Sequence, residues 1–352
     1  HERVASRLVA NIAGLPVTAS HMLSAKLNGP KRALTAVLNA RLVGMIDRLI
    51  GRAQDVLQDI GITAPLMVVR GDGALMSAAA AHAHPIETIL SGPAASIVGA
   101  RWLTGADTAL VSDIGGTTTD IALLRDGRPA IDPDGAQVGP FRTMVEAVAM
   151  RTSGLGGDSQ VHVVGDGLDG GVRLGPRRVL PVSLMATLAP DMVLPLLEQQ
   201  AGSEAPGEHD GRFLRRVGGA MAAHGLGPRE AALMERIGDG VRPVGKVLRT
   251  RMESGALGRL IDRGLVQVSG VTPSDAAHVL GLLDAWDFDA ARFALRSLAR
   301  RRRGSGDVLA PGPDAMARLI IDQLTQQTAE ALLEEAFAEE GDGFKGAPAT
   351  LA

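Results

Sequence analysis

The sequence predicts a mixed α/β fold organised around one β-hairpin, followed by a mostly helical region. The apolar run at residues 108–111 is short and β-branched, which favours a buried strand over a helix. A second apolar run at 121–124 ends at Asp126-Gly127, a dipeptide typical of two-residue hairpin turns, and the return strand is expected from Pro129. Beyond residue 190, helical patterns alternate with short loops.

Composition limits the classes of protein to consider. The chain has 352 residues, enough for one large core or two smaller ones, and only 2% aromatic residues, so the core must be aliphatic. A net charge of -3 gives no reason to expect nucleic acid or an anionic membrane as a partner. The absence of cysteine excludes disulfides and thiolate zinc sites. No run is long enough to span a membrane and no signal peptide is evident, so we expect a cytoplasmic protein.

The first hundred residues predict two helices, a strand and a third helix. The chain starts at His1 without methionine, inside a helix predicted over 2–13, which suggests a fragment. After Gly29-Pro30, apolar residues at three- and four-residue spacing predict a long amphipathic helix that ends at Gly61. A buried strand at 65–69 then leads to Asp72, which either faces a ligand cleft or stabilises a turn.

A further helix is predicted over 94–103, with Ser91 as its candidate N-cap. Its N-terminus either offers N–H groups to an anion or serves only as a Gly-Pro entry into a packed helix.

The turn between the two central strands is Asp113-Ile114-Gly115-Gly116-Thr117-Thr118-Thr119-Asp120. Two adjacent glycines let the backbone approach a ligand closely and direct N–H groups into one concavity, which suits phosphate. The threonines add hydroxyl donors, and the flanking carboxylates can hold Mg²⁺ through water or orient an attacking group. The simpler alternative is a hairpin with a glycine turn and no ligand, in which the threonines are present because threonine favours β-strands.

This hairpin resembles a phosphate-binding hairpin of the actin, sugar-kinase and Hsp70 ATPase superfamily. Other segments resemble the hydantoinase A / 5-oxoprolinase family: Val69–Met76 its Asp-Gly-Gly-Leu-Met segment, Thr88–Ala100 its Ser-Gly-Pro-Ala signature, Gly154–Ser159 its glycine-rich loop, and Leu174–Pro176 the following strand end. The resemblance covers residues 1–182 and resumes at Gly270.

The resemblance implies three parts: an actin-like (ribonuclease H-like) α/β domain at 1–182, a helical insertion at 183–269, and C-terminal helices at 270–352 that return to the actin-like domain. Superfamily members bind ATP between two actin-like halves, each with its own hairpin. Only one hairpin is present here, so the resemblance implies that the first half would precede His1 and that a last strand and helix would follow Ala352.

The resemblance also implies ATP and Mg²⁺ as cofactors and identifies candidate site residues. They are Asp113 and Asp120 as catalytic residues, Asp113 as the metal ligand, and Gly115, Gly116, Thr117, Thr118, Gly156, Gly157 and Asp158 as cofactor-binding residues.

Family members couple ATP hydrolysis to the opening of a cyclic amide such as a hydantoin, a lactam or 5-oxoproline. They commonly work with a B-type subunit, so the expected partner is that subunit or a second copy of the chain. In the family, the strand before the glycine-rich loop usually carries an acid and a histidine, whereas this chain has Ala149 and Arg151. That departure favours a non-catalytic ATPase switch or activator as the alternative. Asp158 stands where the family generally has glycine.

Residues 229–237, 244–253 and 256–263 predict three short helices, and a strand follows to Val268. This order resembles a winged helix-turn-helix, which would fit a transcriptional regulator. Acidic residues are interleaved with the basic ones, however, and this favours a protein-contact module over DNA binding. The residues expected to face inward are Leu233, Ile237, Val247, Leu248, Leu257, Leu260 and Ile261.

Four further features complete the chain. Residues 165–170 have dinucleotide-fingerprint spacing but precede a strand, so we expect a hairpin turn. Thr272-Pro273-Ser274-Asp275 predicts a helix start with Thr272 as N-cap and Asp275 as the capping-box acid. Arg300–Arg303 are expected at a helix end, and residues 314–340 form the last predicted helix.

Overall fold

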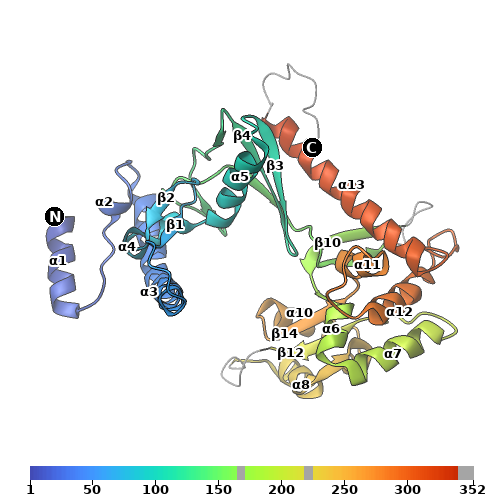
Figure 1. Ribbon diagram of the computed structural model, residues 1–352. Helices are drawn as coiled ribbons and strands as arrows, with labels where there is room; N and C mark the ends of the chain where they lie inside the picture. Colours follow the sequence, from blue (N-terminus) through green and yellow to red (C-terminus); the bar gives the residue numbers. More distant parts are fainter. Residues whose placement is uncertain (165–170, 218–224, 340–352) are drawn as a thin grey trace. The chain divides into compact units, whose positions relative to one another are not determined.

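The computed structural model describes residues 1–164, 171–217 and 225–339, which fall into two compact units (Figure 1). The first unit contains residues 1–113 and 120–152 and the end of the last helix from residue 335. The second contains residues 114–119 and 153–334. Most residues of the two central strands therefore belong to the first unit, and the hairpin tip, with the adjoining strand residues Ile114 and Thr119, belongs to the second. The domain boundaries expected at residues 182 and 269 stay predictions.

The first unit begins with helices and a small antiparallel ribbon. Its elements up to residue 104 are α1 (Glu2–Ala13), α2 (Ser20–Leu23), α3 (Gly29–Asp59), β1 (Met67–Val69), β2 (Leu75–Ser77), α4 (Ala78–Ala83), the 3₁₀ turn η1 (Pro85–Thr88) and α5 (Ser91–Thr104). The helices predicted over 2–13 and 30–61 are confirmed. Asn28 starts α3 because its side chain accepts a hydrogen bond from the Lys31 N–H.

Two local predictions for this region are wrong. β1 is not a buried strand: it pairs antiparallel with β2, and Met67 is 44% exposed. The chain reverses through Gly73, which has a positive φ, and Asp72 stabilises this turn by accepting a hydrogen bond from the Ala74 N–H. Helix α5 starts at Ser91 itself, after Leu90 in a left-handed conformation, so Ser91 is not the N-cap.

The central sheet of the first unit confirms the predicted hairpin. Its strands are β3 (Ala109–Ile114), β4 (Thr119–Arg125) and β5 (Arg128–Pro129), and β8 (Met150–Ser153) pairs with β4. Asp126 and Gly127 both have positive φ, as a tight two-residue turn requires. Helix α5 covers one face, where Ala94 and Ile97 pack on Leu124 (Figure 1). The ribbon of β6 (Gln137–Val138) and β7 (Phe141–Arg142) follows.

The strand before the glycine-rich loop, β8, is short. Val148 makes only an isolated bridge with Ile131, and regular pairing begins at Met150.

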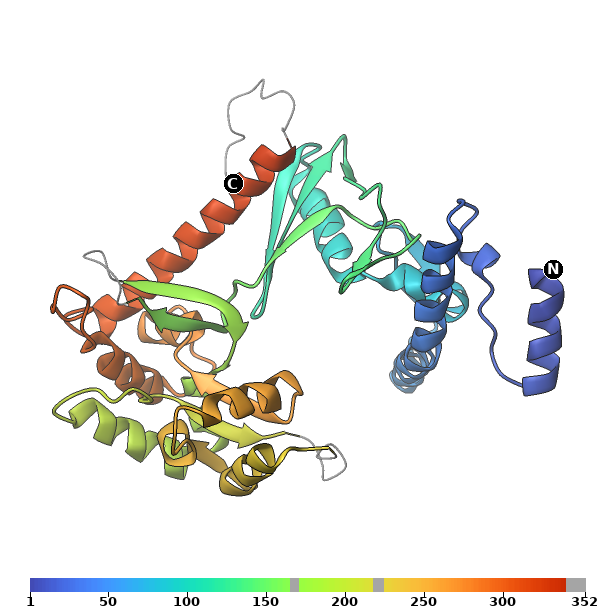
Figure 2. The ribbon, with the colours of Figure 1, turned by 180° about the vertical axis from the view of Figure 1, so that it is seen from behind.

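The second unit contains a hairpin of β9 (Ser159–Val163) and β10 (Val172–Arg178), packed on helix α13 (Pro313–Glu339) (Figure 2). Gln327 of α13 hydrogen-bonds both the N–H and the carbonyl of Leu174 in β10. The turn predicted at 165–170 lies outside the described residues. The largest core is built from α6 (Val182–Leu188), α7 (Pro190–Gly202), α11 (Pro273–Val279), α12 (Phe288–Ala299) and α13.

A four-stranded sheet carries the predicted helical module. Its order is β11 (Leu180–Pro181), β14 (Val266–Gly270), β12 (Phe213–Arg216) and β13 (Val241–Pro243), with β11 parallel to β14 and the other pairs antiparallel. The module's helices are α8 (Pro228–Ile237), α9 (Val244–Val247) and α10 (Glu253–Asp262). Strand β12, which precedes these helices, was not predicted from the sequence.

The compact core predicted for this module is confirmed. Leu233, Ile237, Val247, Leu257 and Leu260 are buried, and Leu248 and Ile261 pack against them while partly buried. The helix predicted over 244–253 is too long, because it divides after Val247. The Glu253 carboxylate accepts hydrogen bonds from the N–H groups of Arg249 and Thr250 in the intervening turn.

Within residues 1–164, 171–217 and 225–339, every helix is too short or too polar to cross a lipid bilayer.

Candidate functional site

The tip of the β3–β4 hairpin is exposed and presents free backbone donors. The Gly115 N–H closes the turn on the Thr118 carbonyl at 2.9 Å. In the described part of the chain, the next three amides, those of Gly116, Thr117 and Thr118, donate to no protein group. Three successive free N–H groups and two hydroxyls at an exposed turn are suited to an oxyanion such as phosphate.

The glycine-rich loop after β8 supports this tip. The Gly157 N–H donates to the Gly115 carbonyl at 3.1 Å, and the Asp158 N–H donates to the Gly116 carbonyl at 2.7 Å. Thr119, which is fully buried, donates its hydroxyl to the Leu155 carbonyl at 2.8 Å. Because the loop holds the carbonyl side of the turn, the N–H side is left for a ligand.

Glycine is required in this loop because two backbones meet there. A Cβ on Gly156 would lie 2.4 Å from the Gly115 carbonyl oxygen, closer than any real contact allows. The Gly156 N–H is also occupied, since it donates to Ser159 Oγ at 2.9 Å. The amides of Gly156, Gly157 and Asp158 are therefore all used within the protein. That these residues contact nucleotide stays a prediction; the structure places them as a support for the tip.

The Asp158 carboxylate lies directly against the tip. It is 12% exposed and accepts hydrogen bonds from Arg178 Nε at 3.1 Å and Nη2 at 2.9 Å. A Cβ on Gly116 would come within 3.0 Å of its Oδ2 atom. The guanidinium therefore balances the charge that Asp158 would otherwise direct at a bound anion.

Sequence reasoning missed two residues of this arrangement, Arg178 and Ser274. Ser274 donates its N–H (2.8 Å) and its hydroxyl (2.9 Å) to the Gly157 carbonyl, and so joins the N-terminus of α11 to the glycine-rich loop. Its position inside the predicted helix start was the only available signal. Nothing in the sequence distinguishes Arg178 from Arg177 beside it.

Asp113 and Asp120 flank the tip at the ends of β3 and β4. Asp113 lies in β3 and Asp120 in β4, and these two strands are neighbours in the sheet. Asp113 Oδ2 accepts a hydrogen bond from Ser96 of α5 at 2.6 Å. Asp120 Oδ1 is buried and has no hydrogen-bond partner in the described residues. One carboxylate from each of two neighbouring strands, one of them with an unsatisfied buried oxygen, fits a hydrated cation such as Mg²⁺.

Protein groups alone do not complete a metal site. Among the described residues, no group of three or more His, Asp or Glu side chains lies close enough to hold a metal ion together. Water and phosphate oxygens would have to supply the remaining ligands, as is usual for Mg²⁺. Ala149 and Arg151 provide neither a carboxylate nor an imidazole before the glycine-rich loop.

The predicted capping box at Thr272 is confirmed, and Asp275 has a wider structural role. Its carboxylate accepts hydrogen bonds from the Thr272 N–H and hydroxyl, both at 2.9 Å. It also accepts from the Val182 N–H at 3.2 Å, the Ser183 N–H at 2.9 Å and the Ser183 hydroxyl at 2.6 Å. Asp275 thus caps α6 and α11 together, although its complete burial raises the pKa of the carboxyl.

Comparison with known proteins gives a consistent result. The sequence profile of the hydantoinase/oxoprolinase family matches residues 32–339. The chain is similar to caprolactamase subunit alpha of Pseudomonas jessenii, with 28% identity over 183 residues, which is 50% of this chain and 25% of that protein. It is also similar to the acetophenone carboxylase gamma subunit of Aromatoleum aromaticum, with 28% identity over 177 residues, 47% of this chain and 23% of that protein.

Solved structures show the same fold. Acetone carboxylase in its nucleotide-free structure matches with a TM-score of 0.52 and 18% identity, over 95% of this chain and 37% of that one. The ATP-dependent caprolactamase of Pseudomonas jessenii matches with a TM-score of 0.50 and 20% identity, over 95% and 38%. The expected fold class, α/β of the actin-like ATPase type, is confirmed. The chain spans about a quarter of the length of the two curated relatives.

Proposed function

Because this chain belongs to the hydantoinase/oxoprolinase family, we propose that it is the phosphate-binding part of an ATP-dependent hydrolase that opens cyclic amides. The observation that carries the proposal is the exposed hairpin tip, where the amides of Gly116, Thr117 and Thr118 have no partner in the described residues. Within the described residues, the backbone hydrogen bonds from the glycine-rich loop to the tip are accepted by the carbonyl oxygens of Gly115 and Gly116. A bound phosphate would therefore meet donors that are already oriented.

In this proposal the hairpin residues divide the work between phosphate and cation. Gly115 closes the turn, while Gly116, Thr117 and Thr118 donate hydrogen bonds to phosphate oxygens. Asp113, positioned by the Ser96 hydroxyl, and Asp120 hold hydrated Mg²⁺. When bound, ATP supplies a phosphoryl group that can activate an amide carbonyl toward water.

The substrate class rests on the relatives. One of them is a caprolactamase subunit, so a lactam, a hydantoin or 5-oxoproline is the proposed substrate. Both curated relatives are named as subunits, which supports a second, B-type subunit as the partner of the whole protein. A second copy of this chain is the other candidate partner.

A second candidate function is a non-catalytic ATPase switch. It is favoured by Ala149 and Arg151, which stand where the family usually carries an acid and a histidine. The two functions differ in what triggers phosphate release. A cyclic-amide hydrolase releases ADP and phosphate only when its substrate is present, whereas a switch hydrolyses ATP slowly without one.

The deciding experiment measures phosphate release by the full-length protein with its partner subunit, with and without a panel of lactams and hydantoins. Release that depends on one of these compounds, together with the ring-opened product, supports the hydrolase. Release that no cyclic amide changes overturns the hydrolase and favours the switch. A failure of ATP to bind overturns both.

A further inference from the structure

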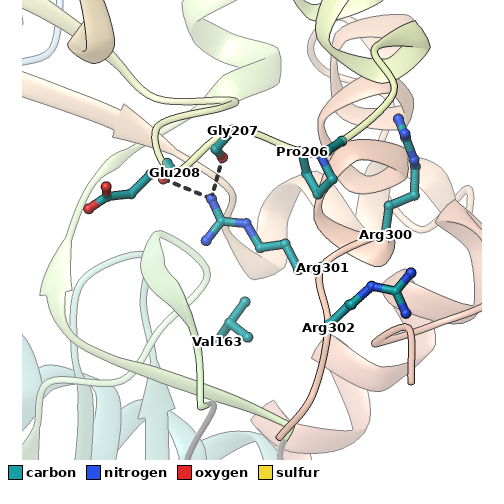
Figure 3. Close-up of a pocket in the computed structure, with 8 residues that line it drawn as sticks. Val163, Pro206, Gly207, Glu208, Arg300, Arg301 and Arg302 are labelled. Atoms are coloured by element: carbon teal, nitrogen blue, oxygen red, sulfur yellow. Dashed lines mark hydrogen bonds between the residues drawn. The ribbon is translucent and has the colours of Figure 1, made fainter. Parts of the chain in front are cut away.

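The arginines of the second unit differ in how they are used within the protein. Arg300 and Arg301, at the end of α12, donate hydrogen bonds to backbone carbonyls of the segment at residues 201–208. Figure 3 shows Arg301 bonded to two of these carbonyls, while Arg300 and Arg302 point in other directions. These arginines hold the segment in place, and their guanidinium groups do not converge on one point.

Four other cations of this unit are left for an external partner. They are Arg242, Lys246, Arg249 and Arg251, which form the basic edge, and all four side chains are exposed. In the described part of the chain, none of them forms an ion pair or a side-chain hydrogen bond. The ten consecutive residues 242–251 contain all four cations and no Asp or Glu. A positive surface of this kind attracts negatively charged groups of a partner.

The buried core of the helical module directs this segment outward. Val244 and Val247 in α9 are each 1% exposed, so this single helical turn presents Lys246 to solvent. Arg242 lies in β13, the outermost strand of the four-stranded sheet as the described residues form it. The basic edge thus runs along one side of the module, from an edge strand through α9 to the start of α10.

The nearest acidic residues along the chain are already paired. Asp239 lies 3.5 Å from Arg216, and Glu253 pairs with Arg236. Glu253 also accepts hydrogen bonds from the N–H groups of residues 249 and 250, which orders the turn that carries the last two cations. From the start of β12 to the end of β14, the sequence contains ten Arg or Lys and five Asp or Glu, a formal charge of +5 in a chain of -3. Positive charge is therefore concentrated on this module.

We propose that the basic edge docks an acidic surface of a partner protein, the B-type subunit; the inference rests on the proposed function for the identity of that partner. Complementary charge across an interface raises the rate of association and excludes wrongly charged partners. Met252, which is 71% exposed and follows Arg251, adds an apolar contact of the kind enriched in protein interfaces. The ordered turn lowers the conformational cost of docking.

The surface fits a protein better than a nucleic acid. In a helix-turn-helix protein, the N-terminal residues of the recognition helix contact the bases. The corresponding helix here is α10, and its first residue is Glu253. Further along α10, Asp262 is exposed and Arg259 is paired with Glu230 at 2.6 Å. Carboxylates on this helix would repel phosphate groups, so the free cations lie beside the helix and not on it.

The test measures association of the full-length protein with its B-type subunit by surface plasmon resonance, without ATP or a cyclic amide. We expect Arg249→Gln/Arg251→Gln to associate about tenfold more slowly at low ionic strength, with a smaller difference at high ionic strength because salt screens the attraction. Arg249→Lys/Arg251→Lys keeps both charges and should keep most of the rate. The melting temperature should be unchanged in both variants, because the substituted side chains are exposed and Glu253 contacts only the backbone of residue 249.

A matched control and a second probe locate the effect. Arg292→Gln/Arg296→Gln removes two exposed arginines from α12, outside the module, and should associate as the wild type does. A short DNA duplex of random sequence is titrated in parallel and should not bind at physiological ionic strength. The proposal is overturned if the B-type subunit does not bind the wild type, if the Gln variant of the basic edge associates as fast as the wild type, or if the control slows equally. Binding of the duplex that the basic-edge variant loses, with subunit association unchanged, would identify a nucleic-acid surface and overturn it as well.

Failure of this inference is distinguishable from failure of the proposed function, because association is measured without turnover. A complex that depends on the basic edge but opens no cyclic amide overturns only the hydrolase. Hydrolysis of a cyclic amide by a complex that forms equally well without these charges overturns only the docking surface.

Discussion

The backbone N–H of Asp158 donates a 2.7 Å hydrogen bond to the carbonyl oxygen of Gly116, while the Asp158 side chain lies against the Gly116 Cα. Asp158 thus contacts the hairpin tip twice, through its backbone N–H and through its carboxylate. We expect the tip to lose its shape when the glycine-rich loop moves away from it. Variants in the loop should therefore affect stability as well as ligand binding, whereas variants of the exposed donors should affect ligand binding alone.

Gly156→Ala should destabilise the protein and weaken ATP binding together. The new Cβ would lie 2.4 Å from the Gly115 carbonyl oxygen, so the loop must move away from the tip. Overpacking of this kind costs about 1–3 kcal/mol. Urea unfolding and ATP titration measure the two effects. Gly258→Ala in α10, where a Cβ would meet nothing within 4 Å, is the control and should be neutral or stabilising. Equal behaviour of the two variants would contradict the supporting role of the loop.

Arg178→Met should leave the Asp158 carboxylate without its charged partner. We expect the free energy of unfolding to fall by about 1 kcal/mol. This is a small loss for a charged pair, because the Arg178 side chain is 57% exposed. In the double variant that also carries Asp158→Asn, the loss of unfolding free energy should be smaller than the sum of the losses in the two single variants. Arg177→Met is the neighbouring control, since Arg177 lies 3.9 Å from Asp262 in a loose pair. Strict additivity in the double variant would show that the Arg178–Asp158 pair has no energetic coupling.

The threonines of the motif should respond differently to loss of the hydroxyl. Thr117→Val removes an exposed donor and should weaken ATP binding about tenfold while leaving the melting temperature unchanged. Thr119→Val should leave the Leu155 carbonyl without its partner and lower the stability by about 1 kcal/mol. Thermal melting and calorimetry on both variants test this contrast. If Thr117→Val binds ATP as well as the wild type does, the hydroxyl is no phosphate donor.

Asp113→Asn should mainly lower Mg²⁺-dependent turnover in the full-length protein. The amide keeps the shape of the side chain and its contact with Ser96, but it lacks the charge that attracts a hydrated cation. ATP binding without Mg²⁺ should therefore be unchanged or slightly stronger. Phosphate release across a Mg²⁺ titration measures the effect, with Ser96→Ala as a milder variant. An unchanged Mg²⁺ dependence would remove Asp113 from the metal site.

Glu253 should make the helical module sensitive to acid. The Arg236 side chain, with the N–H groups of Arg249 and Thr250, lowers the pKa of Glu253 from its ordinary 4.5 to about 2. Since this pKa is depressed in the folded state, the stabilisation is present above pH 4.5 and is lost as the pH falls towards about 2. Urea unfolding across this range should show a shallower acid loss in Glu253→Gln than in wild type. Glu235→Gln, on the exposed side of α8, should follow the wild-type curve.

Gly116→Val is a poor test of phosphate binding, although its position in the motif makes it an obvious choice. The substituted Cβ would point at the Asp158 carboxylate at 3.0 Å and not into open space. Any loss of ATP binding would then have two causes that the experiment does not separate: displacement of the Asp158 carboxylate and obstruction of the phosphate site.

The sequence by itself determined those features that depend on neighbours along the chain. Asp126-Gly127 specified the turn after β4 because both residues tolerate positive φ, and Thr272 with Asp275 specified the start of α11 because a capping box closes within four residues. Apolar spacing predicted α3 and the inward face of the helical module. The hairpin at Asp113–Asp120 was predicted because strand patterns and turn chemistry agreed.

Tertiary structure alone decided which distant groups meet. Arg178 pairs with Asp158 across 20 residues of sequence, and Asp275 caps α6 as well as its own helix because the chain brings Ser183 back beside it. β12 is a central strand only because β13 and β14 pair on either side of it. β1 was expected to be buried but has only β2 as a partner, since burial depends on what packs against a strand. Local propensity acts over a few residues, whereas the partners of a carboxylate or a strand edge are set by packing over the whole unit.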